Sequence, residues 1–212
     1  MYECVVSVHA VVAIRSLDHG KRRLAGALTG RERHKLIQTM MGDVLATLRG
    51  TSGIAALSVL TGDASLVPPG CSHIRDPGLG LNAAVSHAAR VLVAAGATAM
   101  LVLPADLPFL GVEDIHALID AGRDHAIVLA PDAAGCGTNA LLVSPPALIA
   151  PHFGLNSCAA HAAAARALGA KAHLVHRPGL SRDIDEPQHL RILIAAARPR
   201  YAFLVRALRQ AS

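Results

Sequence analysis

Short runs of apolar, often β-branched residues alternate along this chain with longer segments in which apolar residues recur every three or four positions. Such runs predict buried strands, and such segments predict amphipathic helices. Strands are expected at residues 4–14, 54–60, 72–75, 99–103, 126–130, 140–143 and 172–176. Helices are expected at residues 31–48, 112–121 and 159–168, from the 76–83 segment to about residue 95, and from residue 187 onward. The alternation indicates an α/β protein whose domain spans residues 1–197, followed by a basic tail helix at 198–212.

The run Ala99–Leu103 is apolar without interruption, which is typical of a central strand in a parallel sheet. Pro104 and Pro108 end this strand, and Asp106 lies between them. Ligands of open α/β sheets bind beyond the carboxyl ends of the strands, so Asp106 is a candidate for catalysis. The same side chain could instead cap the helix expected to start near Gly111. This stretch alone leaves both interpretations open.

Composition narrows the function classes. The 212 residues are 52% hydrophobic, which is enough for one core and fits one domain better than two. Aromatic residues make up only 2% and Trp is absent, so surfaces for stacking nucleic-acid bases are scarce. The net charge of +5 comes from basic residues spread along the chain, which favours a pocket for small anions over a nucleic-acid patch.

The spacing of the cysteines and the length of the apolar runs indicate where in the cell the protein is expected. The four Cys form no C-x-x-C pair and no paired His stands at ligand spacing, which argues against both a structural zinc and a disulfide framework. No basic region precedes the first apolar stretch, so a signal peptide is not expected. Gly, Pro, His or charged residues interrupt every candidate membrane span. We therefore expect a cytoplasmic protein without a membrane partner.

Four cations follow the first predicted strand within nine residues: Arg15, Lys21, Arg22 and Arg23. Their place after a strand puts positive charge over the carboxyl edge of the sheet, where a triphosphate would suit it. A solvated basic loop is the alternative. A Walker A loop is excluded, because Gly20-Lys21 lacks the upstream Gly and the following Ser or Thr.

The segment from Gly78 to Ala83 matches the dinucleotide-binding pattern G-x-G-x-x-A. It follows the third predicted strand rather than the first, however, and the residues before it are short and polar. The glycines, Gly80 among them, more plausibly let backbone N–H groups approach a base or a phosphate. Asn82 would supply a directional amide beside them.

Two further loops could bind an anion. The first, residues 131–139, contains two glycines and Thr138 between strands, and a plain hairpin is its alternative. In the second, Gly154 precedes a helix for which Asn156 or Ser157 is a natural N-cap, and helix N-termini attract anions. His161 lies four residues after Ser157 on the same helix face, where a surface residue is the simpler interpretation than a ligand.

Asp183 and Asp185 flank the apolar Ile184 near the end of the predicted domain. Residues two apart face the same side in extended backbone, so both carboxylates converge and repel each other unless a cation lies between them. A divalent metal explains this pattern, with Asp106 as the third oxygen ligand, and Mg²⁺ needs few protein carboxylates. Asp185 could alternatively cap the helix from Pro187.

Three aspartates, a cationic loop and two anion-binding loops together describe a pocket for two phosphorylated ligands and Mg²⁺. Transfer of a nucleotidyl group to a phosphate monoester needs no general base, because the second pKa of such a phosphate is about 6. The obstacle is repulsion between two polyanions, which cations and in-line positioning overcome.

The chain resembles the guanylyltransferases of coenzyme F420 biosynthesis, which join GTP to a phosphorylated three-carbon acid. The resemblance covers nearly the whole chain. It rests on V-V-A-I-R…G-K-R-R-L-A (11 to 25), G-L-N-A-A (80 to 84), P-A-D-L-P (104 to 108), G-C-G-T-N-A-L-L (135 to 142), F-G-L-N-S-C-A-A-H (153 to 161) and P-G-L-S-R-D-I-D-E-P (178 to 187). It implies a nucleotidyltransferase fold of the glycosyltransferase A type, with a mostly parallel sheet, one antiparallel strand and flanking helices.

The resemblance also implies roles. Mg²⁺ would be held by Asp106, Asp183 and Asp185; the phospho-acid by Thr138, Gly154 and Ser157; the nucleotide by Ala13, Arg15, Lys21, Gly80 and Asn82; and catalysis would depend on Asp106, Lys21 and Arg23. The acid would be 2-phospho-L-lactate, phosphoenolpyruvate or 3-phospho-D-glycerate, and the residues do not choose among them. A homodimer is reasonable for an apolar chain of this size.

This chain departs from the family pattern at three positions. The family often has Thr, Pro and Lys where this chain has Cys136, Leu155 and Arg15. The first two line the expected acid site, so they bear on acid identity more than on reaction type. The alternatives are a molybdenum-cofactor or sugar nucleotidyltransferase of the same fold, which would usually carry a Gly-Gly-rich loop after the first strand, and a basic nucleic-acid binder.

Overall fold

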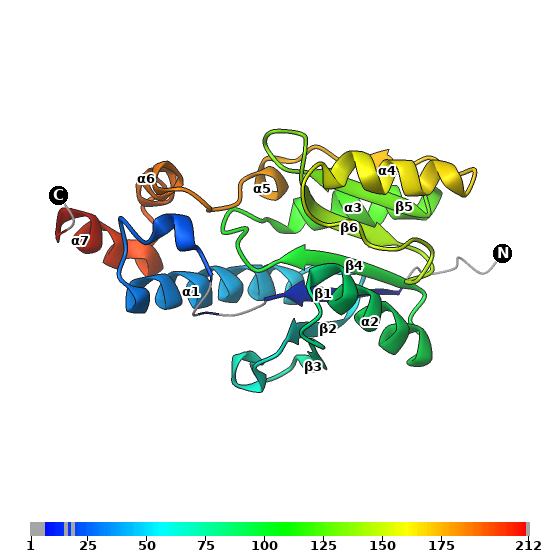
Figure 1. Ribbon diagram of the computed structural model, residues 1–212, viewed down its shortest axis with the longest axis horizontal. Helices are drawn as coiled ribbons and strands as arrows, with labels where there is room; N and C mark the ends of the chain where they lie inside the picture. The colour runs from blue at the N-terminus through cyan, green and yellow to red at the C-terminus, as the bar shows by residue number, and fades with distance from the viewer. Residues whose placement is uncertain (1–6, 15–16, 18–19, 211–212) are drawn as a thin grey trace.

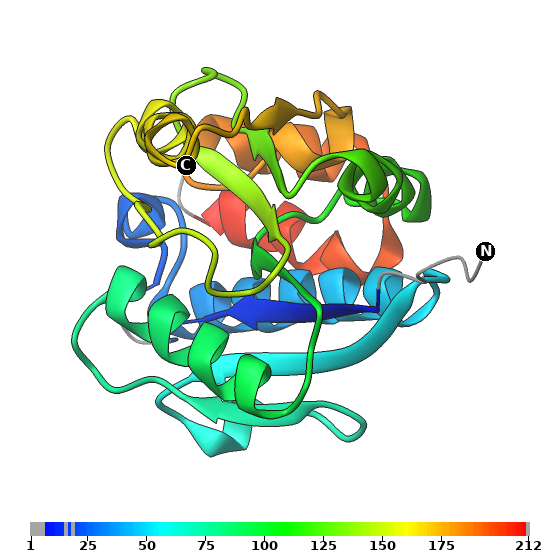
Figure 2. The same cartoon turned by 90° about the vertical axis from the view of Figure 1, so that its right-hand side faces the viewer.

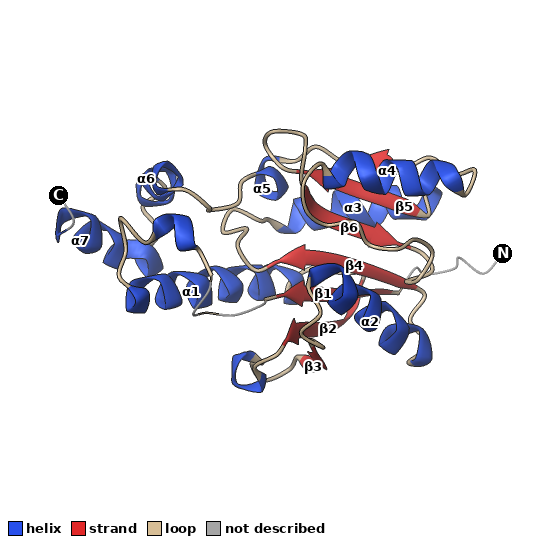
Figure 3. Cartoon of the chain, viewed as in Figure 1, coloured by secondary structure: helices blue, strands red, loops and turns tan. Residues whose placement is uncertain are grey.

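The computed structural model describes residues 7–14, 17 and 20–210. Within these ranges, seven strands form one sheet in the order β3-β2-β1-β4-β6-β5-β7 (Figure 3). The strands are β1 (Val8–Ala13), β2 (Ile54–Thr61), β3 (Ser72–Arg75), β4 (Ala99–Pro104), β5 (Ile127–Pro131), β6 (Thr138–Val143) and β7 (His173–Leu174). Only β6 runs antiparallel to its neighbours, so the prediction of an α/β protein with a mostly parallel mixed sheet is confirmed.

The reversed direction of β6 determines which residues meet at one edge of the sheet. Strand β4 pairs in parallel with β1, so both strands end at the same edge. Val102 of β4 pairs with Leu141 of β6 in antiparallel register, so β6 begins where β4 ends. The loop after β4, which carries Asp106, therefore lies near Thr138 and Asn139 at the start of β6.

Alternate residues of the central strands pack against two different helical layers, as the two-residue period of a strand requires. Ala10 and Val12 belong to the cluster that includes α1 (Gly30–Arg49), α3 (Val112–Asp124) and α5 (Pro178–Ser181). Val11 belongs to the opposite cluster, with α2 (Leu81–Ala94) and α4 (Ser157–Ala167). The sheet thus lies between two layers of helices (Figures 1 and 2).

A third apolar cluster joins the C-terminal elements to the N-terminal half of α1, beyond the sheet (Figure 1). It gathers Leu36 and Met40 of α1 with residues from η1 (Arg22–Leu24), α6 (Pro187–Ala195), η3 (Pro199–Tyr201) and α7 (Ala202–Gln210). The helix expected in the tail is therefore present, and it packs on the helix that follows the first strand. A remaining short helix, η2 (Ala64–Leu66), lies between β2 and β3.

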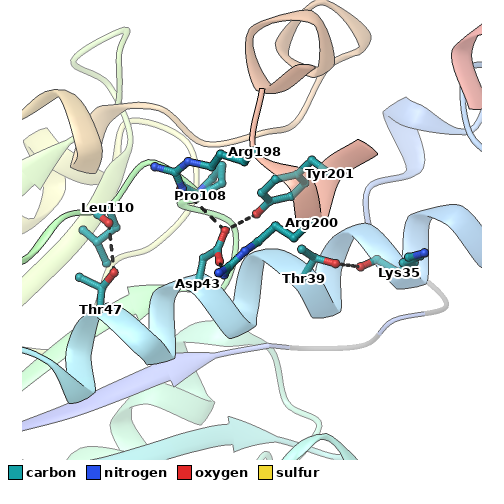
Figure 4. A network of polar contacts seen from close by, with 9 residues as sticks. All are labelled: Lys35, Thr39, Asp43, Thr47, Pro108, Leu110, Arg198, Arg200 and Tyr201. Carbon is teal, nitrogen blue, oxygen red and sulfur yellow. Dashed lines mark hydrogen bonds and ion pairs between the residues drawn. The ribbon is translucent and has the colours of Figure 1, made fainter. Parts of the chain in front are cut away.

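Polar contacts fix these C-terminal elements beside the loop after β4 (Figure 4). Buried Asp43 of α1 accepts hydrogen bonds from Arg200 and from the Tyr201 hydroxyl, and Arg198 donates to the Pro108 carbonyl. Thr47 of α1 donates to the carbonyl of Leu110 at 3.1 Å. The loop that carries Asp106 is thus held at its far end by α1 and by the start of the tail.

Element boundaries differ slightly from the sequence predictions. Helix α4 begins at Ser157, two residues earlier than expected, and β7 covers only His173–Leu174 of the predicted 172–176. The short helix α5 was not expected. Residues 4–6 of the first predicted strand lie outside the described residues. None of the described helices combines the length and apolar character that a membrane span needs.

Candidate active site

A cavity of about 840 Å³ opens at the carboxyl edge of the sheet. Its walls come from β1, the segment after it, the loop after β4, the start of β6 and the residues before α6. The predicted site residues that line it are Ala13, Lys21, Asp106, Thr138, Asp183 and Asp185. This volume is within the range of small-molecule sites, and residues far apart in sequence converge here as the strand-end argument predicted.

Lys21 lines the cavity and contacts two of the aspartates there. Its ammonium donates hydrogen bonds to Asp106 Oδ2 and, at 2.6 Å, to Asp185 Oδ1, and its side chain is 7% exposed. Burial alone would lower the pKa of Lys21, but the attraction of Asp106 and Asp185 raises it above its ordinary value. Lys21 has a left-handed backbone, with φ of 54°, which costs free energy in a non-glycine residue. The site therefore holds a permanently charged lysine in a fixed position.

The three aspartates lie close enough to alter one another's ionisation. Burial first, and then the like charges of Asp106 and Asp185, together raise the pKa of Asp183 to about 6, against the opposing effect of Lys21. Burial also opposes ionisation of Asp185, but Lys21 and Arg23 hold the pKa of that carboxyl below its usual range. Asp106, Asp183 and Asp185 therefore share one cavity, with Lys21 bound to two of them. Their role as ligands of one metal ion stays a prediction.

The capping alternatives for these aspartates are not observed. The N-cap of α3 is Gly111, whose N–H donates to Asp114, and the N-cap of α6 is Glu186. Asp106 and Asp185 bind Lys21 instead. Their carboxylates therefore serve the cavity rather than a helix end.

The donor set fits Mg²⁺ in type. Oδ1 of Asp106 is buried and has no hydrogen-bond partner among the described residues, so one carboxylate oxygen is left for a ligand. Within the same residues, however, no group of three His, Cys, Asp or Glu side chains is arranged so that it could hold a metal ion. Mg²⁺ takes much of its shell from water and phosphate, so a complete protein cage is not required. The ion itself stays a prediction.

Thr138 also lines the cavity, and its hydroxyl lies 3.1 Å from Nδ1 of His161. Nε2 of His161 accepts a 2.8 Å hydrogen bond from the backbone N–H of His152. His161 is fully buried, so its interpretation as a helix-surface residue is wrong: the Ala-rich helix α4 turns this side chain toward the sheet. Burial, together with nearby His152, lowers the pKa of His161 to about 4, against a hydrogen bond to the Ser157 backbone.

Asn82 is committed to the protein backbone. Its amide donates to the Phe153 carbonyl at 3.0 Å and accepts from the Phe153 N–H at 2.7 Å. The side chains of Leu81 and Phe153, next to these groups, line the cavity. Asn82 therefore positions the segment that leads to Gly154, and a direct contact between Asn82 and a nucleotide stays a prediction.

Gly80, Gly154 and Ser157, which were also predicted, are not among the residues that line the cavity. Gly80 and Gly154 have φ of 92° and 133°, which favour glycine, and Ser157 is buried at the start of α4. The α4 N-cap position belongs to Asn156, without a side-chain cap bond. The loop between β5 and β6 is a hairpin closed on Asp132, which accepts from the Cys136 N–H at 2.9 Å.

The basic residues after β1 differ in their exposure to the cavity. Arg22 lines the cavity, whereas the Arg23 side chain is 73% exposed and lies 3.7 Å from Glu186. Arg15 lies outside the described residues. The role predicted for Arg23 in catalysis is untested by this arrangement, but Arg22 is the neighbour of Lys21 that faces the ligand space.

Asn139 and Phe153 also line the cavity. The sequence placed Asn139 in a possible anion-binding loop without a role of its own, and it gave Phe153 no role in the site. Asn139 donates to the Leu180 carbonyl at 2.9 Å and so ties the start of β6 to α5, just before Asp183. It stands in the quoted segment at 135 to 142, beside Thr138, and the antiparallel direction of β6 was the signal that could have placed it.

Known proteins resemble this chain over most of its length. The family described as "Guanylyl transferase CofC like" matches residues 8–208. The phosphoenolpyruvate guanylyltransferase of Rubrobacter xylanophilus is 36% identical over 201 residues, which cover 92% of this chain and 98% of that protein. The phosphoenolpyruvate guanylyltransferase of Conexibacter woesei is 37% identical over 203 residues, 91% of each chain.

Solved structures share the fold at low sequence identity. A Desulfovibrio desulfuricans protein, described as a candidate nucleotide-diphospho-sugar transferase, superimposes with a TM-score of 0.80 at 16% identity, covering 96% of this chain and 97% of that one. The 4-diphosphocytidyl-2C-methyl-D-erythritol synthase of Anaerococcus prevotii gives a TM-score of 0.63 at 11% identity, covering 91% and 96%. At these identities the likeness concerns the fold alone, and it confirms the predicted nucleotidyltransferase fold.

Proposed function

Since the chain belongs to the family of CofC-like guanylyl transferases, we propose that it transfers GMP from GTP to a phosphorylated three-carbon acid and releases pyrophosphate. Phosphoenolpyruvate is the acid we favour, because the relatives that match over most of this chain are named for it. The reaction would serve coenzyme F420 biosynthesis. Among the alternatives from the sequence, the family match favours a guanylyltransferase over a sugar or molybdenum-cofactor nucleotidyltransferase.

The observation that carries this proposal is that Lys21, Asp106, Asp183, Asp185 and Thr138 all line one cavity, with Lys21 bound to Asp106 and Asp185. The cavity therefore offers a cation, carboxylate oxygens and a hydroxyl group. Such a cavity can hold two anionic groups that would repel each other in water.

In the proposed reaction, a phosphate oxygen of the acid attacks the α-phosphorus of GTP. A new P–O bond forms, the bond from that phosphorus to the bridging oxygen of the β-phosphate breaks, and pyrophosphate leaves with the electron pair. No side chain has to remove a proton, because a phosphate monoester is largely ionised at neutral pH. The enzyme's task is to align the two phosphates and to balance their charge.

The charged residues that line the cavity are suited to that task. Lys21 remains protonated, and in the presence of a triphosphate its ammonium can exchange a carboxylate for a phosphate oxygen. Asp106, Asp183 and Asp185 would hold Mg²⁺, which supplies charge neutralisation of the triphosphate when bound. Arg22 extends the positive surface along the same wall.

The acid would lie beside Thr138 and Phe153, which both line the cavity. Gly154, with its φ of 133°, permits a backbone conformation that would expose N–H groups to a carboxylate or phosphate.

The test is direct. Purified protein is mixed with GTP and MgCl₂ and with phosphoenolpyruvate, 2-phospho-L-lactate or 3-phospho-D-glycerate in separate reactions, and pyrophosphate release is measured. We expect turnover with phosphoenolpyruvate, and none when CTP or ATP replaces GTP. Preference for another acid would correct the substrate, and no release with any of the three would reject the proposed function.

A further inference from the structure

The imidazole of His161 is a buried titratable group that has no role in the mechanism above. The ring is fully buried, and both of its nitrogens have protein partners. The Phe153 ring packs against it edge-on, with centroids 5.0 Å apart, so the imidazole is held in one orientation. The ring therefore links Thr138 of β6 to the segment at 152–153.

The partner of Nε2 decides where the ring carries its proton. That partner is the backbone N–H of His152, which can only donate, so Nε2 has to be unprotonated. A neutral imidazole without a proton on Nε2 carries it on Nδ1. If the ring were protonated, the Nε2–H of His161 and the backbone N–H of His152 would be two donors facing each other in a fully buried position.

The proton on Nδ1 in turn decides what the Thr138 hydroxyl can do. A protonated Nδ1 cannot accept, so in the 3.1 Å contact the hydroxyl oxygen of Thr138 is the acceptor and its own proton is directed elsewhere. Thr138 lines the cavity, and across the described ranges its hydroxyl has His161 as its one recorded side-chain partner. The hydroxyl proton is thus left for a group in the cavity.

We propose that His161 is a positioning residue whose Nδ1–H tautomer makes the Thr138 hydroxyl a donor to an anionic oxygen of the phosphorylated acid, while its Nε2 fixes the backbone at His152. This inference rests on the proposed function and adds a specificity element to it. The bidentate contact between Asn82 and Phe153 holds the next residue of the same segment from the side of α2. The backbone before Gly154 is therefore held at His152 by α4 and at Phe153 by α2.

Two substitutions separate the two hydrogen bonds of His161. His161→Gln can place its amide oxygen near the position of Nε2 and keep the bond to His152, but it has no donor near Thr138. His161→Asn can place its amide nitrogen near the position of Nδ1 and keep the bond to Thr138, but it does not reach His152. Thr138→Val removes the hydroxyl itself.

We expect Thr138→Val and His161→Gln each to raise KM for the acid by about tenfold or more, the loss expected for one hydrogen bond to a charged group. KM for GTP should change less than about twofold, because the nucleotide would bind at Lys21 and not at Thr138, and this split is not expected from a general loss of structure. The double variant should be no worse than Thr138→Val, since both remove the same contact. Equal effects of His161→Gln and His161→Asn, or an equal rise in KM for GTP, would overturn the inference.

A measurement on the unsubstituted protein without substrate tests the tautomer on its own. In ¹⁵N NMR spectra of the His-labelled full chain, we expect the His161 ring to show a protonated Nδ1 and an unprotonated Nε2 at neutral pH. A proton on Nε2 would overturn the inference whatever the activity. Failure of all three acids in the pyrophosphate assay would instead reject the proposed function, so the two failures are distinguishable.

Discussion

The Tyr201 hydroxyl donates a 2.6 Å hydrogen bond to Oδ2 of Asp43, a buried carboxylate on α1 (Figure 4). Arg200 donates to Oδ1 of the same carboxylate, but its side chain is 58% exposed. Burial raises the pKa of Tyr201 to about 12, so this phenol stays protonated and able to donate at any working pH. The pair anchors the tail to the helix that also contacts the Asp106 loop through Thr47.

Loss of the Tyr201 hydroxyl should destabilise the fold more than loss of the Arg200 side chain. Tyr201→Phe leaves a buried carboxylate short of one donor, and we expect it to lower the free energy of unfolding by about 2 kcal/mol. Arg200→Ala removes an exposed, solvent-screened cation, and we expect a loss below about 1 kcal/mol. Urea denaturation of both variants checks this order, and a larger loss for Arg200→Ala would contradict it.

The carboxylates at the cavity should be required for turnover and not for folding. Asp106→Asn and Asp183→Asn keep side-chain size but remove charge where the phosphates have to be neutralised, and we expect kcat for pyrophosphate release to fall by about 100-fold or more. Asp120→Asn is the matched control, since that carboxylate is 68% exposed in a surface pair with Arg123. Circular dichroism establishes that the variants fold. Normal turnover in either cavity variant would show that the metal assignment is wrong.

Gly179 is a packing requirement next to the site. A Cβ there would collide with the Asp114 carboxylate and, at 2.6 Å, with the Phe109 backbone carbonyl. The Asp114 carboxylate cannot move freely, because it accepts a hydrogen bond from the Gly111 N–H at the start of α3. We expect Gly179→Ala to lower the free energy of unfolding by about 1–3 kcal/mol, as overpacking usually does. At Gly26 a Cβ would meet no atom within 4 Å, so Gly26→Ala serves as the control with little change. Equal melting temperatures for the two variants would refute this account.

The strand periodicity and the position of Asp106 after a buried run predicted the sheet and one side of the site, because these depend on local sequence and on a general rule of α/β sheets. The sequence did not predict that Lys21 would bridge Asp106 and Asp185. Asp106 lies 85 positions after Lys21 in the chain and Asp185 lies 164 positions after it, so no local pattern signals these contacts.

His161 shows why the other side was harder to predict. One His among alanines on a short helix has the same local pattern whether that face meets solvent or the sheet. Burial of His161 follows from where α4 lies, and that depends on contacts with Thr138 and His152 from other parts of the chain. Local periodicity carries no information on such contacts.

His161 should make stability depend on pH. Its pKa is about 4 in the folded protein and about 6.5 when unfolded, so between these values the unfolded chain binds the extra proton and stability falls as pH falls. At about 1.4 kcal/mol per pKa unit, the full loss is about 3 kcal/mol. Other groups titrate in the same range, and His161→Asn is the reference that separates them because it removes this one titration. We expect the difference in unfolding free energy between the unsubstituted protein and His161→Asn to shrink as pH falls from 7 to 4.5, whereas parallel urea-denaturation profiles would show that the ring is not held neutral.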